Sequence, residues 1–304
     1  MKKVFLVILS YKTHQDTFDL LESLKKIKKD NFDLSIIIVD NYPNDPIKLN
    51  SLDYKELNLI IIYNKENLGF SAGNNVGINE SLKNGADFIV ILNNDTIVDS
   101  LFIEELVKVA ESGKDVGIVT PKIYFAKGYE FHKDRYKENE LGKVIWYAGG
   151  AIDWKNVIGN HRGLDEVDKR QFTEAGETQM ATGCCFLVKK EVLEEVGLYD
   201  DRYFLYFEDA DFSERVKKAG YKIMYEPKAI IWHKNAQSTG AGSNLQTYFQ
   251  TRNRLLFGLS YAPTRAKFAL IRESLRLLVF GRYWQKRGIA DYYFRRFGKG
   301  SFTL

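Results

Sequence analysis

The amino-acid sequence predicts an α/β protein with a mainly parallel central sheet and helices on both faces. Continuous runs of isoleucine, leucine and valine recur through the first 125 residues, and amphipathic segments of helical length separate them. Strands buried on both faces appear as unbroken apolar runs, and parallel strands need crossover helices between them. Together these two observations predict a sheet of parallel strands with helices packed on each side.

The first half alternates strand and helix patterns in a regular order. The expected strands are KVFLVIL, LSIIIVD, LNLIIIYN, DFIVILNND and VGIVTPKIY. The first helix, DTFDLLESLKKIKK, places Phe18, Leu21, Leu24 and Ile27 on one face. Two further helices are expected at SAGNNVGINESLKNG, which a serine opens and Gly85 closes, and at SLFIEELVKVAES. No cleavage pattern follows the first apolar run, so we expect a strand there and not a signal peptide.

The regular alternation stops at about residue 124 and resumes after residue 180. The intervening segment is rich in Tyr, Lys, Glu and Gly, which is typical of a loop-rich insertion that shapes a pocket. The simplest division is one domain over residues 1–257 and a helical tail over residues 258–304. No run approaches the roughly 20 apolar residues of a membrane span.

The composition of the 304 residues is that of an ordinary globular protein, with 45% apolar and 28% charged residues. The net charge of +4 is unevenly distributed. From Arg252 onward, twelve lysines and arginines oppose only Glu273 and Asp291, so this end is basic and the preceding chain is acidic. The two cysteines, Cys184 and Cys185, are adjacent, which excludes a disulfide framework and fits a reducing cytoplasm.

Polar residues follow three of the predicted strands. They are SYK at 10–12, DN at 40–41 and NND at 93–95. A turn that caps the next helix is the simpler interpretation of each. Since open parallel sheets bind ligands at the carboxyl ends of their strands, a nucleotide and metal site is the alternative that we favour.

A glycine-rich stretch, NKENLGFSAGNN, lies between two of these strand ends. Gly69 and Gly73 would let the backbone approach a ligand at the start of the next helix, although a plain turn is equally consistent with them. The stretch matches neither GxGxxG nor GxxxxGK[ST], which counts against a dehydrogenase or a P-loop NTPase.

An acidic cluster, FEDADFSER, supplies candidates for proton transfer. On a helix, Glu208 and Asp211 would share a face with Arg215, whereas Asp209 would point elsewhere and could act as a general base. The alternative is an acidic first helical turn that only complements the helix dipole. His233 ends another apolar run, where it could join Asp95 on a metal or be an ordinary core residue.

Seven stretches in order resemble the inverting family 2 glycosyltransferases, and within them the rhamnosyltransferase-like branch. The resemblance covers roughly residues 4–257 and rests on VILSYK, IIIVDN, NLGFSAGNNVGI, ILNNDT, ATGCCFLVKKEVLEEVGLYDDRYFLYFEDADF, GYKIMYEPKAIIWH and YFQTRNRLLF. It implies a GT-A fold, with a nucleotide-binding half at about 1–123 and an acceptor-binding half at about 124–257. Asn93 stands where the family has the first acid of its Asp-x-Asp motif, which leaves fewer carboxylates for a metal.

The resemblance also implies residue roles. Asp209 would be the catalytic base, assisted by Glu208, and Asp95 and His233 would bind Mg²⁺ or Mn²⁺. Contacts to the acceptor would come from Trp146, Gly183 and Asp211. Contacts to the donor nucleotide would come from Ser10, Tyr11, Lys12, Asp40, Asn67, Gly69, Asn74, Asn93, Asn94 and Arg252.

The implied function is metal-dependent, inverting transfer of a sugar from a nucleoside-diphosphate sugar to a glycan or lipid-linked glycan acceptor. Rhamnose is the first candidate sugar, and cell-surface polysaccharide synthesis is the expected process. Two alternatives are a non-catalytic module that binds a nucleotide or glycan, and a sugar nucleotidyltransferase. The latter usually begins with a basic glycine-rich loop, which the sequence lacks.

The tail at 264–300 mixes cations with aromatic and aliphatic residues. Leu270, Leu277 and Leu278 form an apolar stripe beside these cations, which is typical of a helix that lies on an anionic membrane surface. The alternatives are a helix packed on its own catalytic domain or on a second subunit of a homodimer. We expect a cytoplasmic protein, peripheral on the inner face of the plasma membrane, and no nucleic-acid partner.

Overall fold

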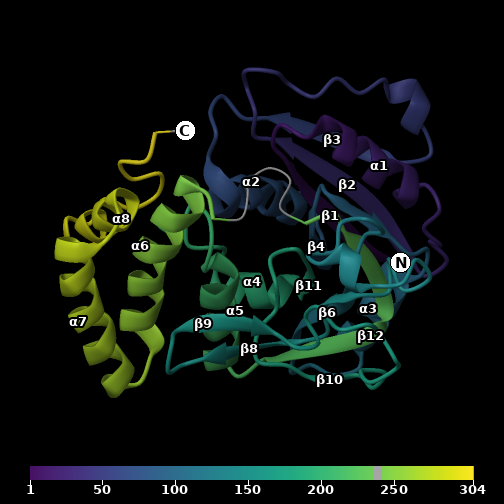
Figure 1. The fold of residues 1–304 in the computed structure, drawn as a ribbon. Helices are drawn as coiled ribbons and strands as arrows, with labels where there is room; N and C mark the ends of the chain where they lie inside the picture. Colours follow the sequence, from purple (N-terminus) through teal and green to yellow (C-terminus); the bar gives the residue numbers. More distant parts are fainter. Residues whose placement is uncertain (236–241, 304) are drawn as a thin grey trace.

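The computed structural model of the chain describes residues 1–235 and 242–303 (Figure 1). The strands are β1 (Lys2–Ser10), β2 (Phe32–Asp40), β3 (Asn58–Tyr63), β4 (Phe88–Asn93), β5 (Thr96–Val98), β6 (Val116–Phe125), β7 (Ile145–Tyr147), β8 (Gly150–Asp153), β9 (Ile158–His161), β10 (Gly176–Glu177), β11 (Cys185–Lys189) and β12 (Lys222–His233). The helices are α1 (His14–Leu24), α2 (Gly69–Lys83), α3 (Phe102–Glu111), α4 (Lys190–Val196), α5 (Glu208–Lys218), α6 (Asn244–Tyr261), α7 (Thr264–Phe280) and α8 (Tyr283–Tyr293).

One mixed sheet organises the molecule, with the strand order β10-β12-β6-β11-β4-β1-β2-β3. The five strands predicted in the first half are all present, and β1 pairs in parallel with both β2 and β4, as β2 does with β3. Strand β11 is antiparallel to its neighbours β4 and β6. The sheet is therefore mainly parallel, as predicted, but a strand from the second half of the chain lies between two strands of the first.

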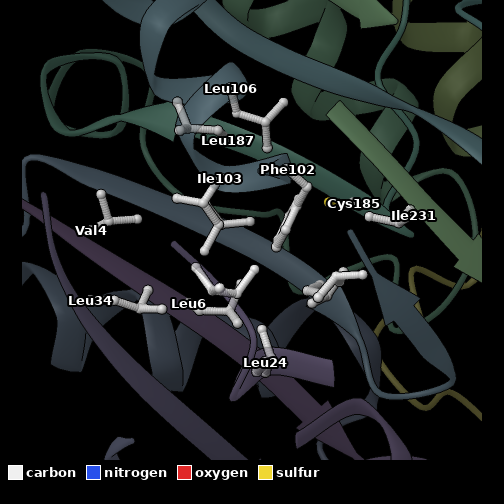
Figure 2. Close-up of a cluster of buried hydrophobic side chains, with 14 of the residues drawn as sticks. Val4, Leu6, Leu24, Leu34, Phe102, Ile103, Leu106, Cys185, Leu187 and Ile231 are labelled. Carbon is white, nitrogen blue, oxygen red and sulfur yellow. The ribbon is translucent and has the colours of Figure 1, made fainter. Parts of the chain in front are cut away.

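Alternate residues of the central strands point to opposite faces of the sheet. Leu6 faces a cluster that includes Phe102 and Ile103 of α3 and Leu24 of α1 (Figure 2). Val7, next along β1, faces the other cluster, which includes residues of α2, α4 and α5. Helices therefore cover both faces, and this explains why the strands appear as unbroken apolar runs.

The tail folds against the body of the protein. Helices α6, α7 and α8 pack side by side, and α5 lies between them and the sheet (Figure 1). Leu270 is buried between them, and Leu277 and Leu278 pack against the same cluster. The leucine stripe predicted to face a membrane thus packs against the protein itself. The predicted boundary at residue 257 falls inside α6.

The other side of α7 is apolar and exposed. Phe268, Leu275, Val279 and Phe280 are 56–81% exposed, and arginines at 265, 272 and 276 lie among them. Within the described residues, no helix is both long enough and apolar enough to cross a membrane.

Candidate active site

A cavity of about 1170 Å³ lies at the carboxyl ends of β1 and β4 and at the start of α2 and α5. Residues from both halves of the chain line it, and α6 and α7 contribute its far end. It brings together most of the residues predicted from the sequence. Those that line it are Tyr11, Lys12, Asn67, Gly69, Asn93, Asn94, Asp95, Trp146, Gly183, Glu208, Asp209 and His233.

Three residues predicted to contact the donor, Ser10, Asp40 and Asn74, do not line the cavity. Asp40 accepts the backbone N–H groups of Tyr42 and Ile47 at 2.9 and 2.6 Å, so its carboxylate closes the loop after β2. The Ser10 hydroxyl pairs with that of Thr17, and the Asn74 amide donates to the Phe70 carbonyl. All three are buried and stabilise the framework behind the cavity.

Arg252 and Asp211 also lie away from the cavity. The Arg252 side chain is fully buried, and its guanidinium donates to backbone carbonyls, including those of Tyr203 and Gly298. It therefore does not reach a diphosphate as predicted. The Asp211 carboxylate is bound by Arg215 at 2.8 Å and by the Tyr261 hydroxyl at 2.8 Å, so it joins α5 to α6 and does not face an acceptor.

Asn41 is a cavity residue that the sequence analysis missed. Its amide donates to the side chain of Asn67 and to the Gly69 carbonyl, and its carbonyl accepts the N–H of Leu68. This one side chain therefore fixes the conformation of the loop that enters α2. The signal was present in the sequence, because Asn41 directly follows Asp40 at a strand end.

Asp95 and His233 meet because β5 pairs with β12, opposite Thr96. Asp95 Oδ1 lies 3.2 Å from His233 Nε2, and both side chains are buried. Burial opposes ionisation of either group, but their mutual attraction outweighs it, so the pKa of Asp95 falls and that of His233 rises well above its usual value.

These two side chains fit a divalent cation. His233 Nδ1 is buried without a hydrogen-bond partner among the described residues, and the buried Asp95 Oδ1 faces His233 Nε2. Carboxylate with imidazole suits Mg²⁺ less well than Mn²⁺. The described residues contain no group of three or more acidic, histidine or cysteine side chains arranged for a metal. A cation here would therefore need further ligands from a substrate or water.

Trp146 packs edge-on between two histidines. Its ring centroid lies 4.6 Å from that of His233 and 4.5 Å from that of His161. Burial lowers the pKa of His161 to about 4, so this ring is neutral at pH 7. The sequence analysis missed His161, because the loop-rich insertion gave no pattern that singled it out. Trp146 and His161 together form a wall of the cavity beside His233.

Asp209 faces the cavity from the first turn of α5. Its carboxylate accepts the N–H of Gly183 at 2.9 Å and that of Ala210 at 2.8 Å. Burial raises its pKa, and these two hydrogen bonds only partly offset the rise. Burial and the neighbouring Asp209 also raise the pKa of Glu208 well above its usual value. A carboxyl group with a raised pKa that faces a cavity is a candidate for proton transfer.

The far end of the cavity is formed by the last helices. Arg254 of α6 forms an ion pair with Glu273 of α7 at 2.9 Å and also donates to the Asn156 carbonyl. All three residues line the cavity. The tail therefore contributes to the site, which the sequence analysis did not predict.

The comparison of the sequence with known families identifies the protein. The profile described as "Glycosyl transferase family 2" matches residues 6–197, which is more than half of the chain. The chain belongs to glycosyl transferase family 2. This confirms the resemblance to the family, and the protein is a glycosyltransferase. The matched region ends before Asp209, so the role of that residue rests on the geometry of the cavity.

Individual relatives match to different extents. The low-salt glycan biosynthesis hexosyltransferase Agl10 of Haloferax volcanii is 23% identical over 253 residues, which is 83% of this chain and 74% of that protein. The N-acetylglucosaminyl-diphospho-decaprenol L-rhamnosyltransferase of Mycobacterium tuberculosis is 44% identical over 59 residues, 19% of each protein. The poly-beta-1,6-N-acetyl-D-glucosamine synthase of Staphylococcus aureus is 29% identical over 223 residues, 72% of this chain and 46% of that protein.

Solved structures of glycosyltransferases share the fold. GalNAc-T7 with UDP, GalNAc and Mn²⁺ superposes with a TM-score of 0.64 at 16% identity, over 96% of this chain and 55% of that one. The mannosyltransferase PcManGT of Pyrobaculum calidifontis, with GDP-Man and Mn²⁺, has a TM-score of 0.52 at 13% identity, over 99% and 76%. The fold is GT-A, as expected from the sequence.

Proposed function

We propose that the protein is a metal-dependent, inverting glycosyltransferase that moves a sugar from a nucleoside-diphosphate sugar to a glycan or lipid-linked glycan. The observation that carries this proposal is the presence, in one cavity, of a buried Asp95–His233 pair and a separate carboxylate with a raised pKa, Asp209. The Asp95–His233 pair could hold a cation beside a leaving diphosphate, and Asp209 could activate the acceptor hydroxyl.

Asp95 and His233 are the residues that would hold Mg²⁺ or Mn²⁺. When bound, such an ion would offset the negative charge that develops on the leaving nucleoside diphosphate. Two solved relatives of the fold contain Mn²⁺ together with a nucleotide or sugar nucleotide, which supports this assignment. Lys12, Asn93 and Asn94 line the same cavity and supply a cation and amide groups for the donor.

Asp209 would take the proton from the acceptor hydroxyl. That oxygen then attacks the anomeric carbon as the bond from this carbon to the diphosphate oxygen breaks, which inverts the anomeric configuration. The N–H groups of Gly183 and Ala210 hold the carboxylate in place throughout. Trp146 offers an aromatic surface for the acceptor sugar beside His233.

For the donor, dTDP-rhamnose remains our first candidate, and UDP-linked hexoses come next. The name of the Mycobacterium relative supports rhamnose, and it also names a lipid-linked acceptor.

For the location, we propose that the exposed side of α7 rests on an anionic membrane surface. Exposed apolar residues with arginines among them are typical of helices that bind such surfaces.

A thermal-shift panel tests the donor and metal sites. UDP, dTDP, GDP and CDP would each be added with and without Mn²⁺ or Mg²⁺. One diphosphate is expected to raise the Tm by about 5 °C at saturation, and only with the metal. Asp95→Asn should abolish this shift, whereas Asp33→Asn, an exposed residue at the start of β2, should preserve it. A panel without any shift would contradict the proposal.

A further inference from the structure

The segment Arg202–Phe207, which leads into α5, has an unusual backbone. Phe204, Tyr206 and Phe207 have φ angles of 62°, 69° and 73°, in the left-handed region that residues with side chains rarely adopt. Three such residues so close together persist only where surrounding contacts impose them. The last of them immediately precedes Glu208 and Asp209, so its conformation sets the direction in which α5 begins.

Asn253 of α6 supplies one set of these contacts. Its amide nitrogen lies 2.8, 2.8 and 2.9 Å from the carbonyl oxygens of Tyr203, Leu205 and Tyr206. An amide carries two protons, so one of them is shared between two of these carbonyls. The side chain is fully buried, and its own oxygen accepts from Arg252 at 2.9 Å.

Arg252 supplies the other set and connects the segment to the end of the chain. One guanidinium nitrogen donates to the carbonyls of Arg202 and Tyr203 at 3.0 and 2.9 Å. The other donates to the Gly298 carbonyl at 2.7 Å, and Gly298 in turn donates its N–H to the Arg202 carbonyl. The two adjacent side chains thus bind four carbonyls of the segment, those of Arg202, Tyr203, Leu205 and Tyr206.

The segment also contacts the donor end of the cavity. The Phe204 carbonyl accepts the N–H of Phe70 at 2.5 Å, at the start of α2. The N–H of Asp211 in α5 donates to the Phe207 carbonyl at 2.9 Å. One short segment therefore joins the glycine loop of the donor side to the helix that carries Asp209.

We propose that Arg252 and Asn253 are positioning residues for the transfer reaction, which hold segment 202–207 so that Asp209 and the start of α2 keep their relative placement. Neither touches the cavity. The inference rests on the proposed role of Asp209 and adds to it the means by which that carboxylate is aimed at the donor.

The test compares the full-length protein with Asn253→Ala, Arg252→Lys and a control, Ser274→Ala. Ser274 of α7 is also buried, but its hydroxyl donates to the Ile271 carbonyl and pairs with the Tyr293 hydroxyl, and not with the segment. Turnover would be measured as nucleoside-diphosphate release from dTDP-rhamnose, or from the UDP- or GDP-sugar whose nucleotide stabilises the protein. Hydrogen exchange over residues 202–209 would be followed in parallel.

Asn253→Ala is expected to lower kcat about 10- to 100-fold and to change the KM for the donor less than about threefold, since the reacting groups are misplaced while the donor contacts remain. The pH at which the activity of this variant falls on the acidic side should also differ from that of the wild type. Arg252→Lys should be intermediate, because it keeps the charge but has fewer donors. Ser274→Ala should lower the Tm and keep the wild-type kcat.

A folded Asn253→Ala protein with the kcat of the Ser274→Ala control would overturn the inference. If Asn253→Ala does not fold, Arg252→Lys decides, and control-like exchange and turnover in that variant would equally overturn it. Asp209→Asn separates the two proposals. Full activity of Asp209→Asn would refute the base itself, whereas an inactive Asp209→Asn with a normal Asn253→Ala would refute only the positioning role.

Discussion

Gly69 illustrates how a single position can constrain the whole cavity. A Cβ atom there would lie 2.6 Å from the Phe204 carbonyl oxygen and 2.5 Å from its ring, and the φ angle is +80°. Phe204 belongs to the strained segment before α5, so no side chain at residue 69 could be accommodated without moving it. Gly69 is therefore required by the segment before α5 as well as by the loop that enters α2.

Gly69→Ala should destabilise the protein more than Gly85→Ala. Both glycines have φ of +80°, but a Cβ at Gly85 would meet only the Lys3 amine at 3.7 Å. We expect about 1–3 kcal/mol of additional loss at Gly69 from the overlap, measured by denaturant unfolding. Equal losses for the two variants would show that backbone strain alone matters.

Asp209→Asn should lower kcat by about 10²- to 10⁴-fold, the usual contribution of a general base. In the wild type, activity should fall as the pH drops through the raised pKa of Asp209, because the protonated acid cannot accept a proton. The stability of the fold depends on pH in the opposite direction to the activity. The folded state favours the protonated acid, so stability is lost as the pH rises from the unfolded pKa toward the folded one.

At pH 8, Asp209→Asn should therefore be at least as stable as the wild type. Any advantage of the variant over the wild type should vanish at pH 3. Melting curves of both proteins across this range would measure it. The raised pKa of Asp209 would be contradicted if the Tm of the variant, relative to that of the wild type, were lower at pH 8 than at pH 3.

Single residues were predictable from the sequence where they follow a strand, and less so within helices. Asp95 and Asn94 directly follow a buried strand, whose end must lie at the edge of the sheet. Arg252 was misplaced because an arginine on a helix usually reaches solvent, and the sequence does not show the carbonyls that instead surround it. Every residue has a backbone carbonyl, so the sequence cannot show where such carbonyls surround a side chain.

Among the elements, the parallel strands were the most predictable. Their apolar runs are long and buried on both faces. The direction of a strand has no such signature in the sequence, so the antiparallel β11 could not be predicted. The three-residue β5 is too short for any pattern, yet it aligns Asp95 with His233.

Helix α7 yields a prediction of its own. Leu275→Glu with Val279→Glu should weaken binding to vesicles containing phosphatidylglycerol by about tenfold or more, because charge replaces apolar contact with the lipid. The Tm should not change, since both residues are more than half exposed. Lys83→Glu, an exposed charge change on α2, is the control. Equal binding by all three proteins would exclude this face of α7 as the membrane contact.

At the scale of the whole molecule, the tail and the catalytic body are interdependent. Arg252 binds the Gly298 carbonyl, and Phe302 packs with Phe204, Tyr248 and Phe249. The sequence suggested a separable basic tail because its charge differs from that of the body, but charge does not report on burial.

Removal of residues 264–304 should therefore abolish cooperative folding, and not merely membrane binding. The truncated chain would expose the apolar surface that Leu270 and Ile289 cover and would leave the Arg252 guanidinium partly unpaired. Circular dichroism during heating would measure the outcome. A sharp transition near the wild-type Tm would show that the tail is dispensable to the fold.

The position of β11 between β4 and β6 also constrains how the protein is made. A ribosome delivers β4 and β6 before β11, so the place between these two strands can be filled only after residue 189 has been added. Asp95 emerges early, but its partner His233 follows more than a hundred residues later. Asp95 and His233 can therefore meet only after both of their strands have been made, so the cavity stays incomplete until β12 has been synthesised.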